Sequence, residues 1–338
     1  MIPIHQALKI CDSRIEHALH SAGVGFNAVT SHLSQAKGKG IRALLLLTAA
    51  ANFPQTDSQT ISAASPNISY AEGVVSENAI LAAAAVEILH MATLVHDDVM
   101  DDAPTRRGMP SVHRKFDVKT AVICGDYLLS VSLCLLADMD KNILKRNAQH
   151  ESLAPKFSRA LSAICKGEYL QHINNGNLDM TLNTYLRIIG GKTAALFYIS
   201  AYAGAALCET SNDEASDIGR FGRMLGMLFQ IADDCKDYAW TESMAKKPVA
   251  NDIRAKVVTL PLIFAMQRDA HLRAVAQEVM AGTKDSAAFA DILRKTHALE
   301  DTHAVFDRYE KWAANALRNV SEAKRNALLE ILSLVQKI

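Results

Sequence analysis

The sequence predicts an all-α protein, and three features of its 338 residues support that fold class. Glycine (16) and proline (8) are sparse, so few positions break a helix. Apolar residues recur at steps of three and four, which is the spacing of one helix face. Apolar residues make up 49% of the chain and charged residues 21%, which is enough apolar side chain for a large core. We therefore expect a single helical domain over residues 1–338.

The apolar stripes place the helices in order along the chain. The clearest stripe precedes Asp237, with apolar residues one helical step apart at Ile218, Phe221, Leu225, Leu228 and Ala232. Similar patterns predict helices over residues 4–21, 41–52, 77–101, 117–137, 155–174, 181–208, 258–267, 287–296, 300–318 and 321–336. Two polar stretches separate helices: residues 53–76 are expected to form a surface loop, and residues 240–256 a mobile flap.

The overall charge excludes some classes of partner. Lys plus Arg and Asp plus Glu both number 36, so the chain has no general attraction for nucleic acid or an anionic membrane. Six scattered cysteines without metal-ligand spacing, and no N-terminal secretory signal, predict a reduced, cytoplasmic protein. The most apolar run, residues 79–95, is interrupted by Glu87 and His90 and is too short to span a bilayer. We expect no stable membrane insertion.

Two acidic motifs of the form DDxxD are the strongest functional signal. The first lies in HDDVMDDAPTRRG, residues 96–108, and the second in FQIADDCKD, residues 229–237. On a helix the first and last aspartates of each motif lie one turn apart on the same face. If aspartate makes up about 6% of residues, one such motif arises by chance in about 7% of chains of this length, and two in fewer than about 1%. A solvated helix end explains one motif; the pair indicates a functional site.

Carboxylate oxygens with room for water are the ligands that Mg²⁺ prefers, and no cysteine or histidine cluster points to zinc. The two motifs are expected to face each other and hold one diphosphate through several Mg²⁺ ions. The predicted metal ligands are Asp97, Asp98, Asp101, Asp233, Asp234 and Asp237.

The chain resembles the trans-isoprenyl diphosphate synthases of the polyprenyl synthetase family from about residue 37 to residue 261. The matching segments keep their order and spacing: KGKGIR, residues 90–108, Gly125–Asp126, CKGEYLQ, GGKTAALF, FQIADDCKDY and KPVANDIRAKVVTLPL. The resemblance implies one bundle of mostly antiparallel helices around a deep cavity, normally a homodimer. It implies isopentenyl diphosphate and an allylic diphosphate as substrates. A small helper subunit is a further possible partner.

The resemblance also assigns roles residue by residue. The isopentenyl diphosphate site is expected at Lys39, Arg42, His90 and Arg107. Arg106 would hold the allylic diphosphate beside the metal ions, as forked guanidinium donors suit phosphate oxygens.

Three further residues, Lys192, Thr193 and Gln230, would flank the allylic carbon and stabilise a carbocation. The sequence departs from the family where Gly40 replaces an arginine and Val257 a lysine. Either Lys247 or Lys256 would cover the pyrophosphate.

The expected reaction is head-to-tail chain elongation by metal-assisted ionisation, condensation and elimination. Ala92 and Thr93, five and four places before Asp97, are small where short-chain relatives carry bulky aromatic residues. A product longer than C15 is therefore expected, such as a medium or long chain for a quinone.

Other functions fit parts of the sequence. A geranylgeranyl diphosphate synthase, or the catalytic subunit of a heteromeric synthase, would keep both motifs. A class I terpene cyclase would carry a different second metal motif and would leave Lys39, Arg42 and His90 without a purpose. A non-catalytic scaffold subunit tends to lose acidic motifs, and a purely structural protein leaves the motifs unexplained.

Overall fold

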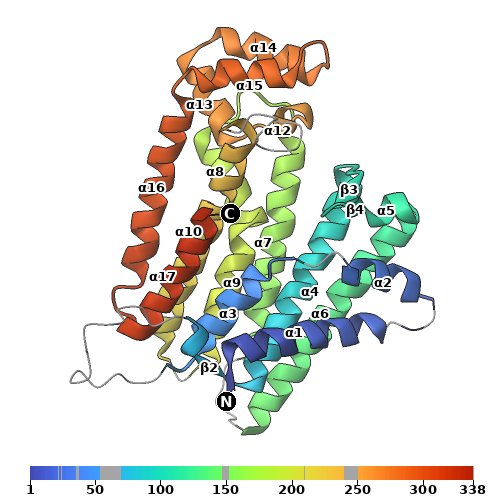
Figure 1. Ribbon diagram of the computed structural model, residues 1–338, viewed down its shortest axis with the longest axis vertical. Coiled ribbons are helices and arrows are strands. Elements are labelled where there is room, and N and C mark those ends of the chain that lie inside the picture. Colours follow the sequence, from blue (N-terminus) through green and yellow to red (C-terminus); the bar gives the residue numbers. More distant parts are fainter. Residues whose placement is uncertain are drawn as a thin grey trace. The chain divides into compact units, whose positions relative to one another are not determined.

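The computed structural model describes residues 1–21, 23, 25–35, 38–53, 70–146, 152–208, 210–239 and 250–337 (Figure 1). Helices dominate these residues, so the all-α prediction is confirmed. The described strands form two short antiparallel pairs: β1 (Ile2–Pro3) with β2 (Val74–Val75), and β3 (Thr105–Arg106) with β4 (Met109–Pro110).

The chain divides into two compact units, each made of several stretches of sequence. Unit 1 comprises Met1–Ser158, Ile199–Gly219 and Arg318–Ile331. Unit 2 comprises Arg159–Tyr198, Arg220–Leu317 and Leu332–Ile338. The first acidic motif belongs to unit 1 and the second to unit 2.

Unit 1 is organised around one long buried helix, α4 (Glu77–Met100), which packs against α1, α3 and α6. Helix α4 begins at Ser76, whose hydroxyl accepts the backbone N–H of Ala79 at 3.3 Å and so caps the first turn. Figure 1 shows α4 and α6 side by side. The other N-terminal elements of this unit are α1 (Ile4–His20), α2 (Asn27–Gln35), α3 (Ile41–Ala50), the short 3₁₀ helix η1 (Tyr70–Glu72), α5 (Val112–Lys115) and α6 (Val118–Arg146).

Two helices of unit 1 are long and apolar enough, by length and composition, to cross a membrane: α4 and residues 118–143 of α6. Residues 79–95 alone are too short to span a bilayer, but α4 as a whole has 24 residues and is long enough. Burial accounts for the apolar composition of α4, because 67% of its apolar 18-residue stretch is buried inside the protein. The corresponding share for α6 is 33%, so this helix exposes much of its apolar surface.

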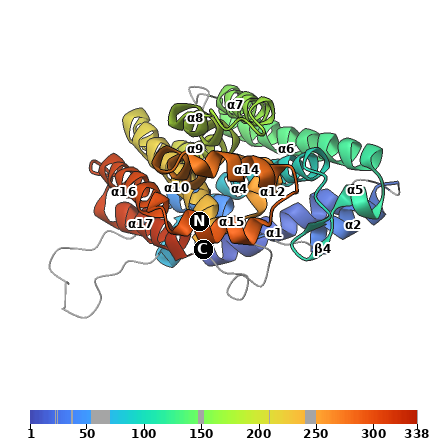
Figure 2. The same cartoon turned by 90° about the horizontal axis from the view of Figure 1, so that it is seen from above.

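Unit 2 has its core where α8, α10 and α13 meet the C-terminal helices. Helix α13 packs against α8, α14, α15 and α16, and α14 lies beside α15, as the view from above shows (Figure 2). The elements are α8 (Leu182–Lys192), α12 (Asn251–Arg254), α13 (Leu260–Arg268), α14 (His271–Met280), α15 (Ser286–Arg294) and α16 (Ala298–Ala316). Four more helices have residues in both units: α7 (Ala154–Ile173), α9 (Ala194–Ala206), α10 (Asn212–Ala239) and α17 (Glu322–Lys337).

The observed helices match most predicted ranges to within a few residues, with one clear correction. Residues 181–208 were predicted as one helix, but α8 ends at Lys192 and α9 begins at Ala194, with Thr193 between them. The break lies beside a close approach of α7. A Cβ atom on Gly167 of α7 would be 2.3 Å from the backbone nitrogen of Lys192. The pattern also missed α2, α5, α12 and α14.

Candidate functional site

The first acidic motif occupies the C-terminal end of α4, and its three aspartates differ in environment. Asp98 is 4% exposed and accepts hydrogen bonds from Nε of Arg106, at 2.8 Å, and from its Nη2. Asp97 is partly buried and Asp101 is exposed. The accessible carboxylates are therefore the pair one turn apart, Asp97 and Asp101, while Asp98 holds Arg106 in place.

The turn after the motif is fixed by local hydrogen bonds. The Ser111 hydroxyl donates to the carbonyl oxygen of Ala103 at 2.6 Å. Arg114 forms an ion pair with Asp102 at 2.6 Å, and Asp102 has a left-handed φ of 49°. This turn carries Arg106 back to Asp98.

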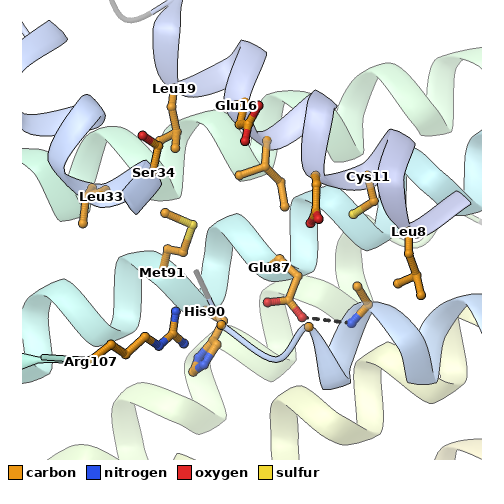
Figure 3. Close-up of a pocket in the computed structure, with 15 residues that line it drawn as sticks. Leu8, Cys11, Glu16, Leu19, Leu33, Ser34, Glu87, His90, Met91 and Arg107 are labelled. Carbon is orange, nitrogen blue, oxygen red and sulfur yellow. Dashed lines mark hydrogen bonds between the residues drawn. The ribbon is translucent and has the colours of Figure 1, made fainter. Parts of the chain in front are cut away.

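A cluster of basic groups lies beside the N-terminus of α3: His90, two turns before the motif on α4, Arg107, which follows the motif, and Arg42 of α3 itself. Arg107 and His90 point toward one another in a cavity that α1 and α4 line on opposite sides (Figure 3). Burial lowers the pKa of Arg42 to about 10 and also lowers the pKa of Arg107, whereas the charge of Glu87 opposes both shifts. Unit 1 thus brings together three of the four residues predicted for isopentenyl diphosphate. Lys39 is exposed on the segment just before α3.

The imidazole of His90 is neutral at neutral pH. Its pKa lies well below the ordinary 6.5, first because of burial and then because of three nearby arginine charges, those of Arg42, Arg107 and Arg106. A neutral imidazole can still donate one hydrogen bond to a phosphate oxygen.

This shift predicts a pH dependence of stability. Below pH 6.5 the unfolded chain binds a proton at His90 that the folded protein does not bind. The free energy of unfolding is therefore expected to fall as the pH falls below 6.5, by up to about 1.4 kcal/mol per pH unit from this group. Urea unfolding at pH 7.5, 6.5 and 5.5 measures the slope. The His90→Gln variant is expected to show a shallower slope, and equal slopes would contradict the prediction.

The second acidic motif lies near the end of α10 and repeats the arrangement of the first. Asp234 is 4% exposed; one of its oxygens accepts the Tyr185 hydroxyl at 2.6 Å and the other the Gln230 amide at 2.9 Å. Burial, more than any other effect, raises the pKa of Asp234 to about 7. Asp233 is exposed and Asp237 is partly buried. The more accessible pair is again the one with one-turn spacing.

The predicted carbocation-stabilising residues lie next to this motif. The Thr193 hydroxyl donates to the side-chain oxygen of Gln230 at 2.7 Å, and the amide nitrogen of Gln230 donates to Asp234 at 2.9 Å. Lys192 forms an ion pair with Glu168 of α7 at 2.9 Å. Unit 2 thus brings together Lys192, Thr193, Gln230 and the second motif.

Helix α12 is attached directly to the second motif. Both side-chain oxygens of Asp237 accept backbone N–H groups, from Asn251 at 3.0 Å and from Asp252 at 2.9 Å. Asp252 itself is a further carboxylate in this cluster. Burial, followed by the charges of Asp234 and Asp237, raises its pKa well above the ordinary value.

The remaining predicted residues have less distinctive surroundings. Lys256 is exposed with a left-handed φ of 62°, its carbonyl accepts the N–H of Gly176 at 2.7 Å, and it lines a groove with Arg273. Lys247 lies outside the described residues. Ala92 is 2% exposed and belongs to a buried cluster with residues of α1, α2, α5 and α6, while the hydroxyl of the partly buried Thr93 donates to the carbonyl of His90.

Sequence reasoning missed four residues that support these groups: Glu87, Glu168, Tyr185 and Asp252. Two signals were present in the sequence. Glu87 lies one turn before His90 on the same helix face, and Glu168 lies within the matched CKGEYLQ segment. The contacts of Tyr185 and Asp252 depend on the fold.

The donor set suits divalent cations that prefer oxygen ligands, because each unit offers one carboxylate pair at one-turn spacing, Asp97 with Asp101 and Asp233 with Asp237. Asp98 and Asp234 are the buried members of the two motifs, and they accept hydrogen bonds from the side chains of Arg106 and Tyr185. Asp237 also accepts hydrogen bonds from the protein, but from backbone N–H groups and at a less buried position. Asp98 and Asp234 fit the role of positioning groups better than that of metal ligands.

Comparison with known proteins identifies the family of the chain. Residues 25–296 match the family model described as Polyprenyl synthetase. The chain is 32% identical over 329 residues to the heptaprenyl diphosphate synthase component 2 of Geobacillus stearothermophilus, covering 97% of this chain and 94% of that protein. It is 31% identical over 341 residues to an all-trans-nonaprenyl-diphosphate synthase (geranyl-diphosphate specific) of Rhodobacter capsulatus, covering 99% and 95%. The crystal structure of a polyprenyl synthase from Caulobacter crescentus, complexed with calcium and isoprenyl diphosphate, matches with a TM-score of 0.81 at 26% identity, covering 99% of this chain and 95% of that chain.

Proposed function

The chain belongs to the polyprenyl synthetase family and is a prenyltransferase, and from this premise we propose that it condenses isopentenyl diphosphate with an allylic diphosphate into a trans-polyprenyl diphosphate longer than C15. The observation that carries the proposal is the presence of two DDxxD motifs, each with its outer carboxylates more accessible than its middle one and with basic or polar substrate groups beside it. Both motifs serve the same reaction in this proposal, within one catalytic domain over residues 1–338.

Divalent ions belong to the proposal. The outer aspartates of the two motifs would hold Mg²⁺, which when bound would supply positive charge that stabilises a departing pyrophosphate. We propose three Mg²⁺ ions per active site, with Mn²⁺ as a substitute. The calcium in the related Caulobacter structure supports a divalent ion in this role.

The side chains of the protein bind and orient the two substrates. In unit 1, Arg42, His90 and Arg107 bind the isopentenyl diphosphate, assisted by Lys39, and Arg106 binds the allylic diphosphate from the position that Asp98 gives it. In unit 2, Thr193 and Gln230, which are hydrogen-bonded to each other, flank the allylic carbon in this proposal and stabilise the developing carbocation. The isopentenyl double bond attacks the cation, and the released pyrophosphate removes the proton. Exclusion of water protects the cation. Lys247 or Lys256 covers the pyrophosphate.

Product length is expected to depend on two residues of α4, Ala92 and Thr93, past which the growing chain would extend. Ala92→Phe should shorten the main product by at least one C5 unit, because a ring at this position takes space that a growing chain would use. Because Ala92 is a core residue, the ring is also expected to cost about 1–3 kcal/mol of stability. Thr93→Phe, at a less buried position on the next face, is the companion variant. Chromatography of the dephosphorylated products measures the chain length. An unchanged distribution of product lengths from both folded variants would contradict the proposal that Ala92 and Thr93 limit the length of the product.

The exposed apolar surface of α6 supports an assembly of two copies. Four large apolar residues of this helix are between 40% and 55% exposed: Val118, Val122, Ile123 and Leu133. A homodimer that covers this face would remove the surface from water. The name of the Geobacillus relative, component 2, supports the alternative in which a helper subunit completes the enzyme. We also propose a cytoplasmic location, because the scattered cysteines suit a reduced compartment.

The decisive experiment incubates the purified chain with labelled isopentenyl diphosphate, Mg²⁺ and each allylic primer in turn, and sizes the products after dephosphorylation. Products longer than C15 support the proposal. A C20 product alone would identify the geranylgeranyl alternative, and product formed only with an added small subunit would identify the heteromeric one. Cyclic hydrocarbon from an allylic diphosphate alone would identify a terpene cyclase. If no substrate is turned over, the alternative of a non-catalytic scaffold subunit would be favoured.

A further inference from the structure

Glu87 is a carboxylate beside the cationic cluster of unit 1 to which the proposed reaction assigns no role. It lies in the middle of α4, one helical turn before His90, and its side chain lines the same cavity as His90 and Arg107 (Figure 3). Its Oε1 accepts the backbone N–H of Ala43 at 2.9 Å, and Ala43 lies in the first turn of α3.

This hydrogen bond replaces a missing helix cap. The first N–H groups of a helix have no intrahelical acceptor and are usually satisfied by a side chain at the N-cap. The N-cap of α3 is Gly40, which has a left-handed φ of 61° and offers no side chain. Glu87 therefore caps α3 from a different helix, and in doing so it fixes the backbone on either side of Arg42.

The charge of Glu87 also acts on the cluster. It raises the pKa values of both Arg42 and Arg107, against the lowering caused by burial. In a free protein these two guanidinium groups and Arg106 repel one another, and a nearby carboxylate reduces that cost until a diphosphate binds.

The segment that precedes α3 is held against the same group of side chains. A Cβ atom on Gly38 would lie 2.6 Å from Nη2 of Arg107, so the backbone at this position rests directly on the guanidinium group. Glu87 at one end of the segment and Arg107 at the other thus determine where Lys39 and Arg42 can lie.

We propose that Glu87 is a positioning residue for the isopentenyl diphosphate half of the reaction: it anchors the first turn of α3, and with it Arg42, and it balances the charges of Arg42 and Arg107 before the substrate binds. This inference rests on the proposed function for the identity of the substrate. It assigns Glu87 no contact with either substrate.

Two substitutions separate the two parts of this role. Glu87→Gln keeps a side-chain oxygen that can accept the Ala43 N–H but removes the charge, whereas Glu87→Ala removes both. We expect Glu87→Ala to raise KM for isopentenyl diphosphate by about tenfold, which corresponds to the loss of one charge-assisted hydrogen bond. Glu87→Gln should raise it by a smaller factor. KM for the allylic primer and kcat should change by less than about twofold. Glu16→Gln, an exposed carboxylate on the α1 wall of the same cavity, is the matched control and should leave both KM values unchanged.

A purely structural role would lower the melting temperature and shift both KM values together, without the selective effect. That result, or an unchanged KM for isopentenyl diphosphate in both Glu87 variants, would overturn the inference. If Glu87→Ala does not fold, Glu87→Gln keeps the cap and decides the charge part alone: a raised KM supports it and an unchanged KM overturns it.

Direct binding distinguishes failure of this inference from failure of the proposed function. Calorimetric titration of each variant with isopentenyl diphosphate needs no turnover. If the wild type makes no product but binds this ligand, and Glu87→Ala binds it about tenfold more weakly, the positioning role stands while the proposed reaction fails. If the wild type does not bind isopentenyl diphosphate, both are wrong.

Discussion

Alanine in place of Asp97 or Asp233 is expected to reduce turnover by at least about a hundredfold, with little change in fold. Asp97 is partly buried and Asp233 is exposed, so neither substitution empties a packed core. Each aspartate is the first member of a one-turn pair, and its loss removes one of the two carboxylates that would hold a cation against a diphosphate. Steady-state kinetics over a range of Mg²⁺ concentrations, with circular dichroism of each variant, measure both effects.

Asp213→Ala is the control for this experiment, because Asp213 is exposed in the first turn of the same helix, α10, that carries Asp233. We expect it to keep wild-type turnover. Folded Asp97→Ala and Asp233→Ala variants with wild-type turnover would refute the assignment of both motifs.

Alanine at Gly167 is expected to disturb both stability and activity. The added Cβ atom would lie 2.3 Å from the backbone nitrogen of Lys192 and 2.8 Å from the carbonyl carbon of Gly191, so neither neighbour can yield by rotating a side chain. We expect a loss of at least about 1–3 kcal/mol of stability, the usual cost of overpacking. Activity should fall further than the unfolded fraction explains, because the displaced backbone carries Lys192 away from Glu168.

Urea unfolding and kinetics at a temperature where the variant is folded separate the two effects. Gly25→Ala is a suitable control, because a Cβ atom there has no other atom within 4 Å. Wild-type stability for Gly167→Ala would mean that α7 and α8 can move apart without cost.

Sequence periodicity predicted most helices because their positions depend on local spacing. The boundaries of α4 follow from Ser76 at one end and the acidic turn at the other. The break at Thr193 could not be predicted in this way, since the apolar pattern continues through GGKTAALF. It coincides with the contact of two backbones, at Gly167 and Gly191, that are 24 positions apart.

The six aspartates were predicted from the sequence, but which of them are buried and hydrogen-bonded to other side chains was not. All six were predicted as metal ligands, and those roles remain predictions. The helical period does place the middle aspartate of each motif about 100° around the helix from the first aspartate and about 60° from the last. That offset points Asp98 and Asp234 toward the interior. Their partners, Arg106 and Tyr185, come from segments that only the fold brings close.

The capping hydrogen bonds between different helices could not be predicted from the sequence either. Glu87 satisfies the N–H of Ala43, 44 positions earlier, and Asp237 satisfies two N–H groups of α12. Local rules look for a cap within the residues that begin a helix, and neither α3 nor α12 has a side-chain cap there.

The different surroundings of the aspartates within each motif have a consequence for natural variation. At Asp98 and Asp234 a longer glutamate would have to push its carboxylate into groups that already enclose the shorter side chain, so these two positions should tolerate few replacements in descendants of this protein. Asp101 and Asp233 are exposed, so a longer glutamate meets fewer packed neighbours there. Selection there acts on chemistry alone, so lineages that lose the reaction should change these two residues first.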